Sequence, residues 1–228
     1  MDKGWRSNNN EITILGRGKS LEKLKGFEVN SNSVIAVNEF WKTRGNPSDY
    51  YKEPIIAAFL NGKDITLLTT PRKGCGHALS KDLESTHNVI NKFNTVWSGG
   101  SGTDRDQPPV PSWSVMPKEC LEVYKYTHLS GNLKSSDLKG KGAVRGSLAY
   151  AILLAVKYYD AGVINIFGLD FYEADYFVPQ HHNYEKEKTQ SESIKKDFSS
   201  LFNYFQHVQF NVHTLANYNP NLNNVNVK

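Results

Sequence analysis

Polar and aromatic side chains follow an apolar run in the segment GLDFY, residues 168–172. Tyr172 and Tyr176 carry hydroxyl groups that can donate hydrogen bonds to a departing phosphate without bringing a charge. His181 and His182 come next, and a histidine can take a proton from a sugar hydroxyl near neutral pH. These residue types at this spacing predict proton transfer combined with stabilisation of a leaving phosphate.

Each of these residues also has a structural interpretation, which stays open at this point. A single tyrosine is most often a half-buried packing residue with an exposed hydroxyl. His181 and His182 could be a surface pair, and adjacent histidines in a loop without a nearby cysteine lack the spacing of a metal site. Asp170 could do no more than cap the turn that follows the apolar run.

The turn GRGKS, residues 16–20, is a second candidate because it joins an apolar run to a helical pattern. Its backbone amides and the helix dipole could hold one anionic group, and Arg17 and Lys19 add positive charge. A triphosphate-binding loop needs a glycine where this chain has Thr13, so the turn is too short for a triphosphate. The sequence therefore predicts a turn for a single phosphate, and a tight turn without a ligand is equally open.

The strands and helices that must position these residues alternate along the chain. The apolar patterns predict strands at 11–15, 33–38, 64–69, 163–167 and 208–214, and helices at 20–25, 84–94 and 147–159. Thr189 and Glu192 are expected to form a capping box at the start of a further helix, whose apolar residues share one face. The alternation predicts an α/β fold, a three-layer sandwich with a mostly parallel Rossmann-like sheet that binds ligands at the carboxyl ends of its strands.

The composition is that of a globular domain on the polar side. Apolar residues make up 39% and charged residues 22% of the 228 residues. The formal net charge of +4 is scattered along the chain, which suits an anionic ligand but gives no strong nucleic-acid signal. Cys75 and Cys120 follow no pattern, so we expect reduced thiols and no disulfide.

One domain is expected at residues 11–216, with a lid-like loop rich in Gly, Ser and Pro at about 97–116. Residues 217–228 are a polar, Asn-rich tail that is expected to fray. The start of the chain is polar and resembles no signal peptide, and the longest apolar run is too short to span a membrane. We therefore expect a cytoplasmic protein, with or without peripheral membrane contact, unless a targeting segment has been removed.

Several segments resemble the bacterial sialyltransferases that make lipooligosaccharide sialic acid caps. They are LGRGKSLEKL, IAVNEFW, SLAYAILLAVKYYDAGVINIFGLDFY, and the two histidines with the last helix and strand. The resemblance covers residues 12–215, best at its two ends, and its most specific parts are NEF at 38–40 and GLDFY. It implies one α/β domain of the glycosyltransferase-A-like kind, CMP-sialic acid as donor, no metal or other cofactor, inversion at the transferred sugar and often a homo-oligomer.

The resemblance implies two catalytic roles. Tyr172 and Tyr176 look like the pair that hydrogen-bonds the leaving CMP phosphate. His181 or His182 resembles the general base that deprotonates the acceptor, with His182 slightly preferred. These are the same residues that the chemistry of the segment singled out.

The resemblance also implies a donor-binding set. Asn38 looks like the donor-site asparagine after the second strand, and Thr70 stands where the family has a further donor-contacting asparagine. Arg17 and Lys19 replace an asparagine and a proline of the family turn, a change that could alter the choice of nucleotide or sugar. The expected donor-binding residues are Gly16, Arg17, Gly18, Lys19, Ser20, Asn38, Thr70, Gly146, Ser147, Gly168 and Asp170.

The sequence therefore predicts an inverting, metal-independent glycosyltransferase that moves sialic acid or a related nonulosonate from a CMP-sugar to a glycan hydroxyl. Its expected partners are the nucleotide-sugar donor and the glycan acceptor. One alternative is a metal-dependent glycosyltransferase in which Asp104 and Asp106 hold the metal against a nucleotide diphosphate. Another is a non-catalytic relative that binds a nucleotide or a glycan without turning it over.

Overall fold

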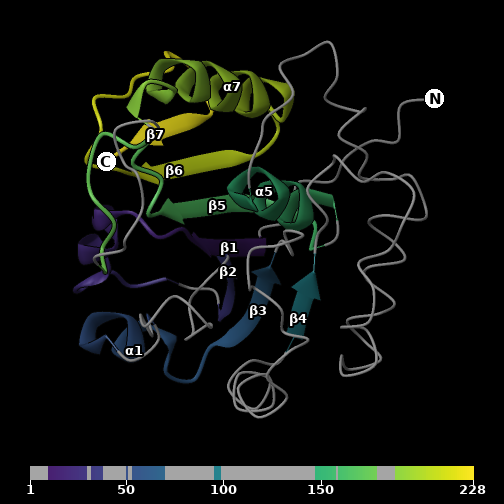
Figure 1. Ribbon diagram of the computed structural model, residues 1–228. Coiled ribbons are helices and arrows are strands. Elements are labelled where there is room, and N and C mark those ends of the chain that lie inside the picture. Colours follow the sequence, from purple (N-terminus) through teal and green to yellow (C-terminus); the bar gives the residue numbers. More distant parts are fainter. Residues whose placement is uncertain are drawn as a thin grey trace, which may run out of the picture.

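The computed structural model describes residues 10–29, 32–37, 50, 53–69, 95–98, 147–157, 159–178 and 188–228, and strands alternate with helices along them (Figure 1). The elements in chain order are β1 (Asn10–Leu15), the 3-10 helix η1 (Lys19–Leu24), β2 (Ser33–Val37), α1 (Pro54–Leu60), β3 (Asp64–Thr69), β4 (Thr95–Ser98), α5 (Ser147–Lys157), β5 (Ala161–Phe167), α7 (Ser191–Tyr204), β6 (Gln209–His213) and β7 (Val225–Val227). The predicted strands are all present within two residues of their expected bounds.

The strands form one sheet in the order β4-β3-β2-β1-β5-β6-β7, and every neighbouring pair is parallel. The chain builds the sheet outward from β1 to β4 and then returns to place β5 on the other side of β1. The predicted α/β fold with a parallel, Rossmann-like sheet is confirmed. Because the strand order reverses between β1 and β5, a ligand crevice is expected at the carboxyl ends of these two strands.

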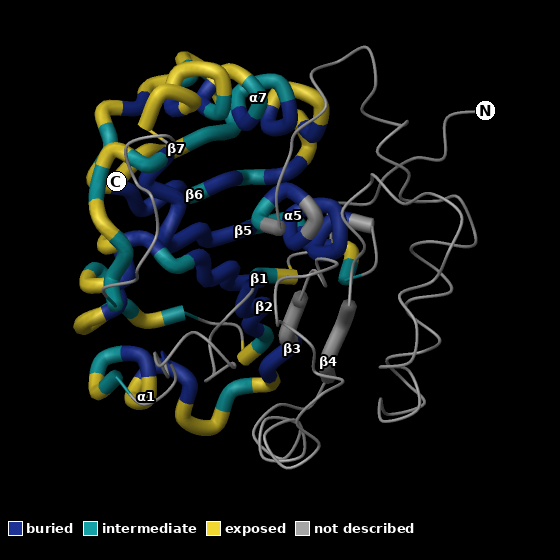
Figure 2. The backbone as a smooth tube through the Cα atoms, in the orientation of Figure 1, coloured by how far each residue is buried: buried dark blue, intermediate teal, exposed yellow. Residues whose placement is uncertain are grey.

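Helices cover both faces of the sheet because buried side chains alternate between the two faces along each strand. On one face, α5 and α7 pack in a core that includes Ile164 and Ile166 of β5. On the other face, η1 and α1 pack around Leu15 and Phe167. Figure 2 shows the buried residues of β1, β2, β5, β6 and α5 inside, with the exposed residues of α1 and α7 on the outside. Each large apolar side chain buried in this way contributes about 1.5–3 kcal/mol to the free energy of unfolding.

Helix α7 is amphipathic, as predicted, with Phe198 and Phe202 buried against the sheet. The predicted capping box is wrong. The N-cap residue is Gln190, and it makes no side-chain cap hydrogen bond. The helix begins later than the box requires, and the Glu192 carboxylate accepts from the Lys195 ammonium, three residues further along the helix, at 3.0 Å.

Residues 217–228 are built into the fold, so the prediction that they fray is wrong. They contain β7, which pairs with β6, and the ring of Tyr218 is buried in the main core. The Asn224 side-chain amide donates to the carbonyls of Phe202, Phe205 and Val208 at 3.0–3.1 Å. Carbonyls at a helix end lack intrahelical partners, and this asparagine supplies one. This one asparagine of the segment therefore bonds to the backbone at the end of α7 and just beyond it.

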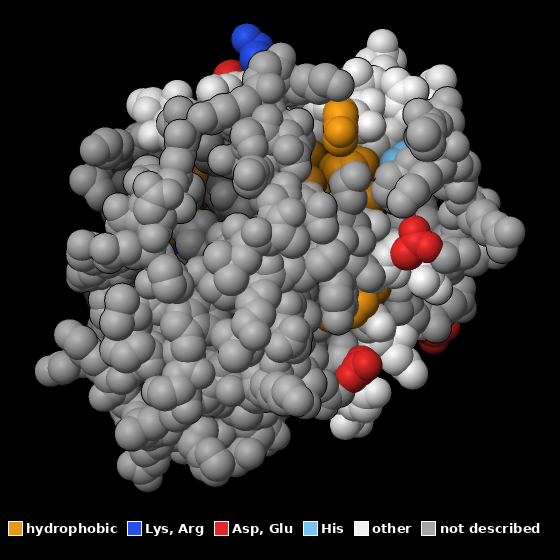
Figure 3. Space-filling view, turned by 90° about the vertical axis from the view of Figure 1, so that its right-hand side faces the viewer, with side chains coloured by type: hydrophobic (Ala, Val, Ile, Leu, Met, Phe, Trp, Pro, Cys, Tyr) orange, Lys and Arg blue, Asp and Glu red, His pale blue; other side chains and the backbone are white. Residues whose placement is uncertain are grey.

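Two further expectations differ from the structure. Trp97 and Ser98 belong to β4, so the lid-like loop does not begin at 97; residues 99–116 and the predicted helix 84–94 lie outside the described residues. The short helix after β1 is a 3-10 helix. No helix among the described residues is long and apolar enough to cross a membrane. In the view of Figure 3, acidic side chains and small areas of apolar surface are visible among the described residues.

Candidate functional site

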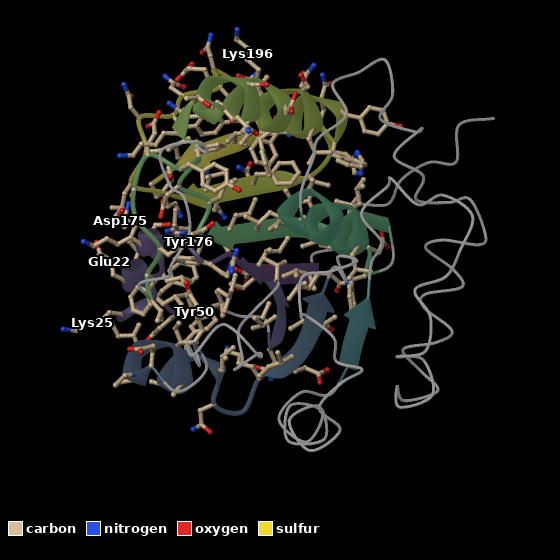
Figure 4. The ribbon with its side chains drawn as sticks, viewed as in Figure 1. Glu22, Lys25, Tyr50, Asp175, Tyr176 and Lys196 are labelled. Atoms are coloured by element: carbon tan, nitrogen blue, oxygen red, sulfur yellow. The ribbon has the colours of Figure 1, made fainter. Side chains whose placement is uncertain are left out.

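The turns that follow β1 and β5 lie together at the point where the strand order reverses. Gly18 and Tyr176 form an antiparallel bridge, and the Lys19 amide donates to the Asp175 carbonyl at 2.9 Å. Figure 4 shows Asp175 and Tyr176 at this edge of the molecule, beside η1. The structure therefore brings the GRGKS turn and the segment after GLDFY to one place.

Gly16 and Gly168 put the backbones of the two turns in contact. A Cβ added to Gly16 would lie 2.5 Å from the Gly168 carbonyl oxygen, and a Cβ added to Gly168 would lie 2.5 Å from the Gly16 carbonyl carbon. Gly168 also has a φ of +75°, which residues with a side chain rarely adopt. Both glycines are required for the close approach of the two turns.

Asp170 is a buried carboxylate at the centre of this junction, with 3% of the residue exposed. Its Oδ2 accepts from the Ser20 amide at 2.8 Å, and its Oδ1 accepts from the Leu215 amide at 2.9 Å and the Thr214 hydroxyl at 3.1 Å. The hydroxyl of Ser20, which is also buried, accepts from the Gly168 amide at 2.9 Å. Asp170 and Ser20 thus join the turn after β1, the turn after β5 and the segment after β6.

The backbone amides of the GRGKS turn donate to acceptors within the protein, one of which is the Asp170 carboxylate. Four amides of the turn donate to acceptors within the protein, namely those of Gly16, Gly18, Lys19 and Ser20. Three of these amides bond to carbonyls and the fourth to the Asp170 carboxylate, so in this structure all four have acceptors within the protein, and a contact of the turn with a donor phosphate stays a prediction. A Cβ on Gly18 would collide with the same carboxylate. The sequence could not show this, because Asp170 lies 150 residues from Ser20.

Phe171 and Tyr172 both have a left-handed backbone, with φ of +50° and +60°. Bulky residues rarely adopt this conformation because Cβ approaches the following carbonyl oxygen. The chain turns sharply here, and the Glu173 amide donates to the Asp170 carbonyl at 2.8 Å. Phe171 is buried in the core, whereas Tyr172 is half-buried. Strained backbone of this kind concentrates at functional sites, which favours a functional interpretation of Tyr172.

The guanidinium of Arg17 lies over the ring of Tyr176, 4.9 Å from its centroid. The Arg17 carbonyl accepts from the Phe177 amide at 2.9 Å and from the Tyr50 hydroxyl at 3.2 Å. Tyr50 is buried and had not been predicted as part of the site, since no motif surrounds it. The cation–π contact keeps the positive charge and the phenol next to each other. Arg17 and Tyr176 are therefore presented together at the edge of the sheet.

His213, at the carboxyl end of β6, was also not predicted as a feature of this region. Its ring stacks on Phe167 with centroids 4.0 Å apart and meets Phe27 edge-on at 4.8 Å. Among the described residues, its Nε2 is a buried atom without a hydrogen-bond partner. Burial, with the nearby charges of Lys228 and Lys23, lowers the pKa of His213 to about 4. The ring is thus neutral at pH 7 and belongs to the packing of the site.

Other predicted site residues lie outside the described residues: Asn38, Thr70, Gly146, His181 and His182, and also Asp104 and Asp106 of the metal-dependent alternative. Ser147 is the first residue of α5. Its neighbour Leu148 has a side-chain carbon 3.0 Å from where a Cβ of Gly16 would stand, so the start of α5 lies beside the turn after β1. Within the described part of the chain, no group of three or more His, Cys, Asp or Glu side chains could hold a metal ion.

Comparison with known proteins gives solved structures alone. No protein-family model matches the chain, and no curated protein matches it. A structure of the sialyltransferase Cst-II in complex with a trisaccharide acceptor and CMP is 15% identical, with a TM-score of 0.48, and the match covers 90% of this chain and 81% of that one.

Two further structures of this sialyltransferase are similar to the chain. A variant in complex with CMP is 15% identical, with a TM-score of 0.45 and coverage of 89% and 80%. The enzyme from Campylobacter jejuni in complex with the substrate analogue CMP-3FNeuAc is 13% identical, with a TM-score of 0.45 and the same coverage. At these identities and TM-scores the likeness does not extend to activity, which has to be argued from the residues of the site.

Proposed function

We propose that this chain is an inverting glycosyltransferase that transfers sialic acid or a related nonulosonate from a CMP-sugar to a glycan hydroxyl. The observation that carries the proposal is the junction of the turns after β1 and β5. It gathers the strained Tyr172 and the stacked pair of Arg17 and Tyr176 at the carboxyl ends of the two central strands. Two phenols and one permanent positive charge are suited to stabilising a departing phosphate.

In the proposed reaction, the bond between the anomeric carbon of the nonulosonate and the phosphate oxygen of CMP breaks, and an acceptor oxygen bonds to that carbon from the opposite face. The proton of the acceptor hydroxyl passes to His182 or His181, and CMP leaves with the electron pair. The donor's own carboxylate and ring oxygen share the charge of an oxocarbenium-like transition state. Tyr172 and Tyr176 donate hydrogen bonds to the phosphate, and Arg17 balances its charge.

The donor-binding set divides into two groups in this proposal. Direct contacts with the donor are assigned to Arg17, Lys19, Asn38, Thr70, Gly146 and Ser147. Support of the site is assigned to Gly16, Gly18, Ser20, Gly168 and Asp170, whose side chains or backbones bond and pack between the turns. Ser147 is favoured by the position of the start of α5 beside Gly16.

Thermal unfolding in EDTA tests the donor class. The protein is heated with CMP, CDP, UDP, GDP or ATP, and the series is repeated with magnesium and with manganese. A ligand at a hundred times its Kd stabilises the folded state by about 2.7 kcal/mol, which raises Tm measurably. We expect a shift with CMP that is the same with and without metal. A shift that needs metal and a nucleotide diphosphate would overturn the proposal in favour of Asp104 and Asp106.

An assay of CMP release, added to the unfolding experiment, separates catalysis from binding alone. A chain that is stabilised by CMP but releases no CMP from CMP-N-acetylneuraminic acid in the presence of a range of glycan acceptors would be a non-catalytic relative. A chain that shows neither the shift nor the release would not use a CMP-sugar. The proposal requires both the shift and the release.

A further inference from the structure

The loop that carries Tyr172 is anchored on both sides by acidic residues. On one side, Asp170 accepts hydrogen bonds from Ser20, Thr214 and Leu215. On the other side, Glu173 is attached to α7. Tyr172 therefore stands between two residues whose carboxylates are both bonded to distant parts of the chain, and its own φ is +60°.

Glu173 is held by three donors. Its Oε1 accepts from the Lys195 ammonium and, at 3.0 Å, from the Ser191 hydroxyl, and its Oε2 accepts from the Asn217 amide at 3.0 Å. The Lys195 ammonium also pairs with Glu192 at 3.0 Å. Lys195 is 9% exposed, so its charge lies largely out of water, on the face of α7 that turns toward the loop.

Both members of this pair are charged at neutral pH. Partial burial tends to raise the pKa of Glu173, but the hydrogen bonds from Lys195, Ser191 and Asn217 outweigh this effect and lower the pKa. Burial tends to lower the pKa of Lys195, and the hydrogen bonds and charges of Glu173 and Glu192 raise it. The Lys195 side chain is largely buried, whereas that of Glu173 is 31% exposed, so the pair lies where α7 and the loop meet at the surface and adds little to stability by its charges alone.

Phe171, which lies between Asp170 and Tyr172, is fixed as well. The ring of Phe171 lies 4.5 Å from that of Tyr218 and 5.9 Å from that of Phe198, measured between centroids. The Tyr218 hydroxyl is 3.0 Å from the Ser199 hydroxyl. Helix α7 thus contacts the loop through both Phe198 and Lys195, and strained backbone persists only where the surroundings determine it in this way.

We propose that Lys195 and Glu173 form a positioning pair, which holds the backbone of Tyr172 in its left-handed conformation and so aims the Tyr172 hydroxyl at the leaving phosphate. This inference rests on the proposed function. Neither residue touches the reacting atoms; Lys195 acts through Glu173, and Glu173 acts through the adjoining peptide of Tyr172.

The first test compares three variants in CMP release from CMP-N-acetylneuraminic acid with lactose as acceptor. Lys195→Met removes the charge and keeps most of the volume, Lys195→Arg keeps the charge, and Lys196→Met is the matched control. Lys196 is exposed on the same helix and points outward (Figure 4). We expect Lys195→Met to lower kcat roughly tenfold to a hundredfold, with a smaller change in the KM for the donor, because a misplaced group costs about this much. Lys195→Arg should recover part of the loss, and Lys196→Met should match the wild type.

A double-mutant cycle distinguishes positioning from a purely structural role. If Lys195 acts through Tyr172, then Lys195→Met in a Tyr172→Phe background should lower kcat little further, since the hydroxyl that it aims is already absent. Additive losses in kcat would overturn the proposal. Equal kcat in wild type and Lys195→Met would overturn it as well. If Lys195→Met does not fold, Glu173→Gln takes its place in the cycle, because glutamine has the shape of glutamate without its charge.

Hydrogen exchange gives a readout that does not depend on activity. Lys195→Met should increase exchange in peptides that cover residues 171–178 while leaving exchange in β5 unchanged. Unchanged exchange in 171–178, or an equal increase in β5, would overturn the pair as a local anchor. If wild type releases no CMP, the proposed function has failed and the exchange result alone decides whether the pair holds the loop. If wild type is active and Lys195→Met equals it, the positioning inference has failed and the proposed function stands.

Discussion

The Asp170 carboxylate accepts a hydrogen bond from the Ser20 amide at 2.8 Å. An acidic residue of the turn after β5 therefore satisfies a backbone donor in the first turn of η1, the helix that follows β1. Most backbone amides of the GRGKS turn therefore donate hydrogen bonds within the protein, and the turn joins β1 to the turn after β5. We assign the proposed phosphate contact to the positive side chains of the turn, above all to Arg17, which lies over the ring of Tyr176. This moves the proposed phosphate contact from the backbone of the turn to side chains.

Asp170→Asn should destabilise the protein. The carboxylate accepts three hydrogen bonds in a buried place, and an asparagine would turn an amide group toward at least one of these donors. We expect a loss of about 1–3 kcal/mol in the free energy of unfolding, measured in urea. Asp175→Asn, at an exposed position in the same segment, is the control and should change stability little. Equal stability of the two variants would show that the junction of the two turns does not depend on the carboxylate.

Gly168→Ala should lower the free energy of unfolding by more than the positive φ of this residue alone explains. The new Cβ would lie 2.5 Å from the Gly16 carbonyl carbon, whereas a Cβ at Gly26, with a nearly equal φ of +74°, would meet nothing within 4 Å. Gly26→Ala therefore measures the backbone cost, of about 1 kcal/mol, and Gly168→Ala should exceed it by roughly 2 kcal/mol or more. Thermal or urea unfolding of both variants checks the difference. If both lose the same amount, the two turns are not in contact.

His213 should make stability fall on acidification. The pKa of His213 is about 4 in the folded protein, against 6.5 for an ordinary histidine, so the unfolded chain takes up a proton that the folded chain does not as pH falls from about 6.5 to about 4. The contribution of His213 to the free energy of unfolding is fully present above pH 6.5. It is lost as pH falls to about 4, by an amount of order 1–3 kcal/mol. His213→Phe, which keeps an aromatic ring on Phe167, should flatten the urea-unfolding profile between pH 4 and 7. The exposed His207→Gln is the control and should keep the wild-type slope.

Arg17→Ala should weaken the binding of CMP more than it weakens the fold. The guanidinium stacks on Tyr176 and is the permanent charge proposed to face the phosphate. A charge-assisted hydrogen bond contributes about 1.5–3 kcal/mol, so the Kd for CMP, measured by calorimetry, should rise roughly tenfold or more. Lys25→Ala, an exposed cation near the end of η1, should leave the Kd unchanged (Figure 4). An unchanged Kd in Arg17→Ala would remove Arg17 from the site.

The fold could be predicted from the sequence because its signals are local. The buried run of β5 and the apolar helix before it indicate one half of a parallel unit, and both are present. The turns after β1 and β5 could be placed at one edge for the same reason. The fate of the Asn-rich tail could not be predicted, because Asn224 bonds to carbonyls at the end of α7, a relation that no local pattern contains.

The residue types of the candidate site and its edge of the sheet could be predicted, but the contacts within it could not. Tyr172 and Tyr176 follow from their place after a buried strand, and the structure puts both at the predicted edge. The roles of Asp170 and Ser20 could not be predicted, because a buried carboxylate and a ligand phosphate satisfy a turn amide equally well. The positions of His181, His182 and Asn38 lie outside the described residues, and their roles stay predictions.

The central claim is tested most directly by CMP release from CMP-N-acetylneuraminic acid in EDTA, with lactose as acceptor, in wild type, Tyr172→Phe and His182→Ala. We predict acceptor-dependent release by wild type without added metal. Each variant should lower kcat by roughly one to four decades, as expected when a proton acceptor or a donor to the leaving group is lost. Full activity of both variants, or release by wild type only after a divalent metal is added, would contradict the claim.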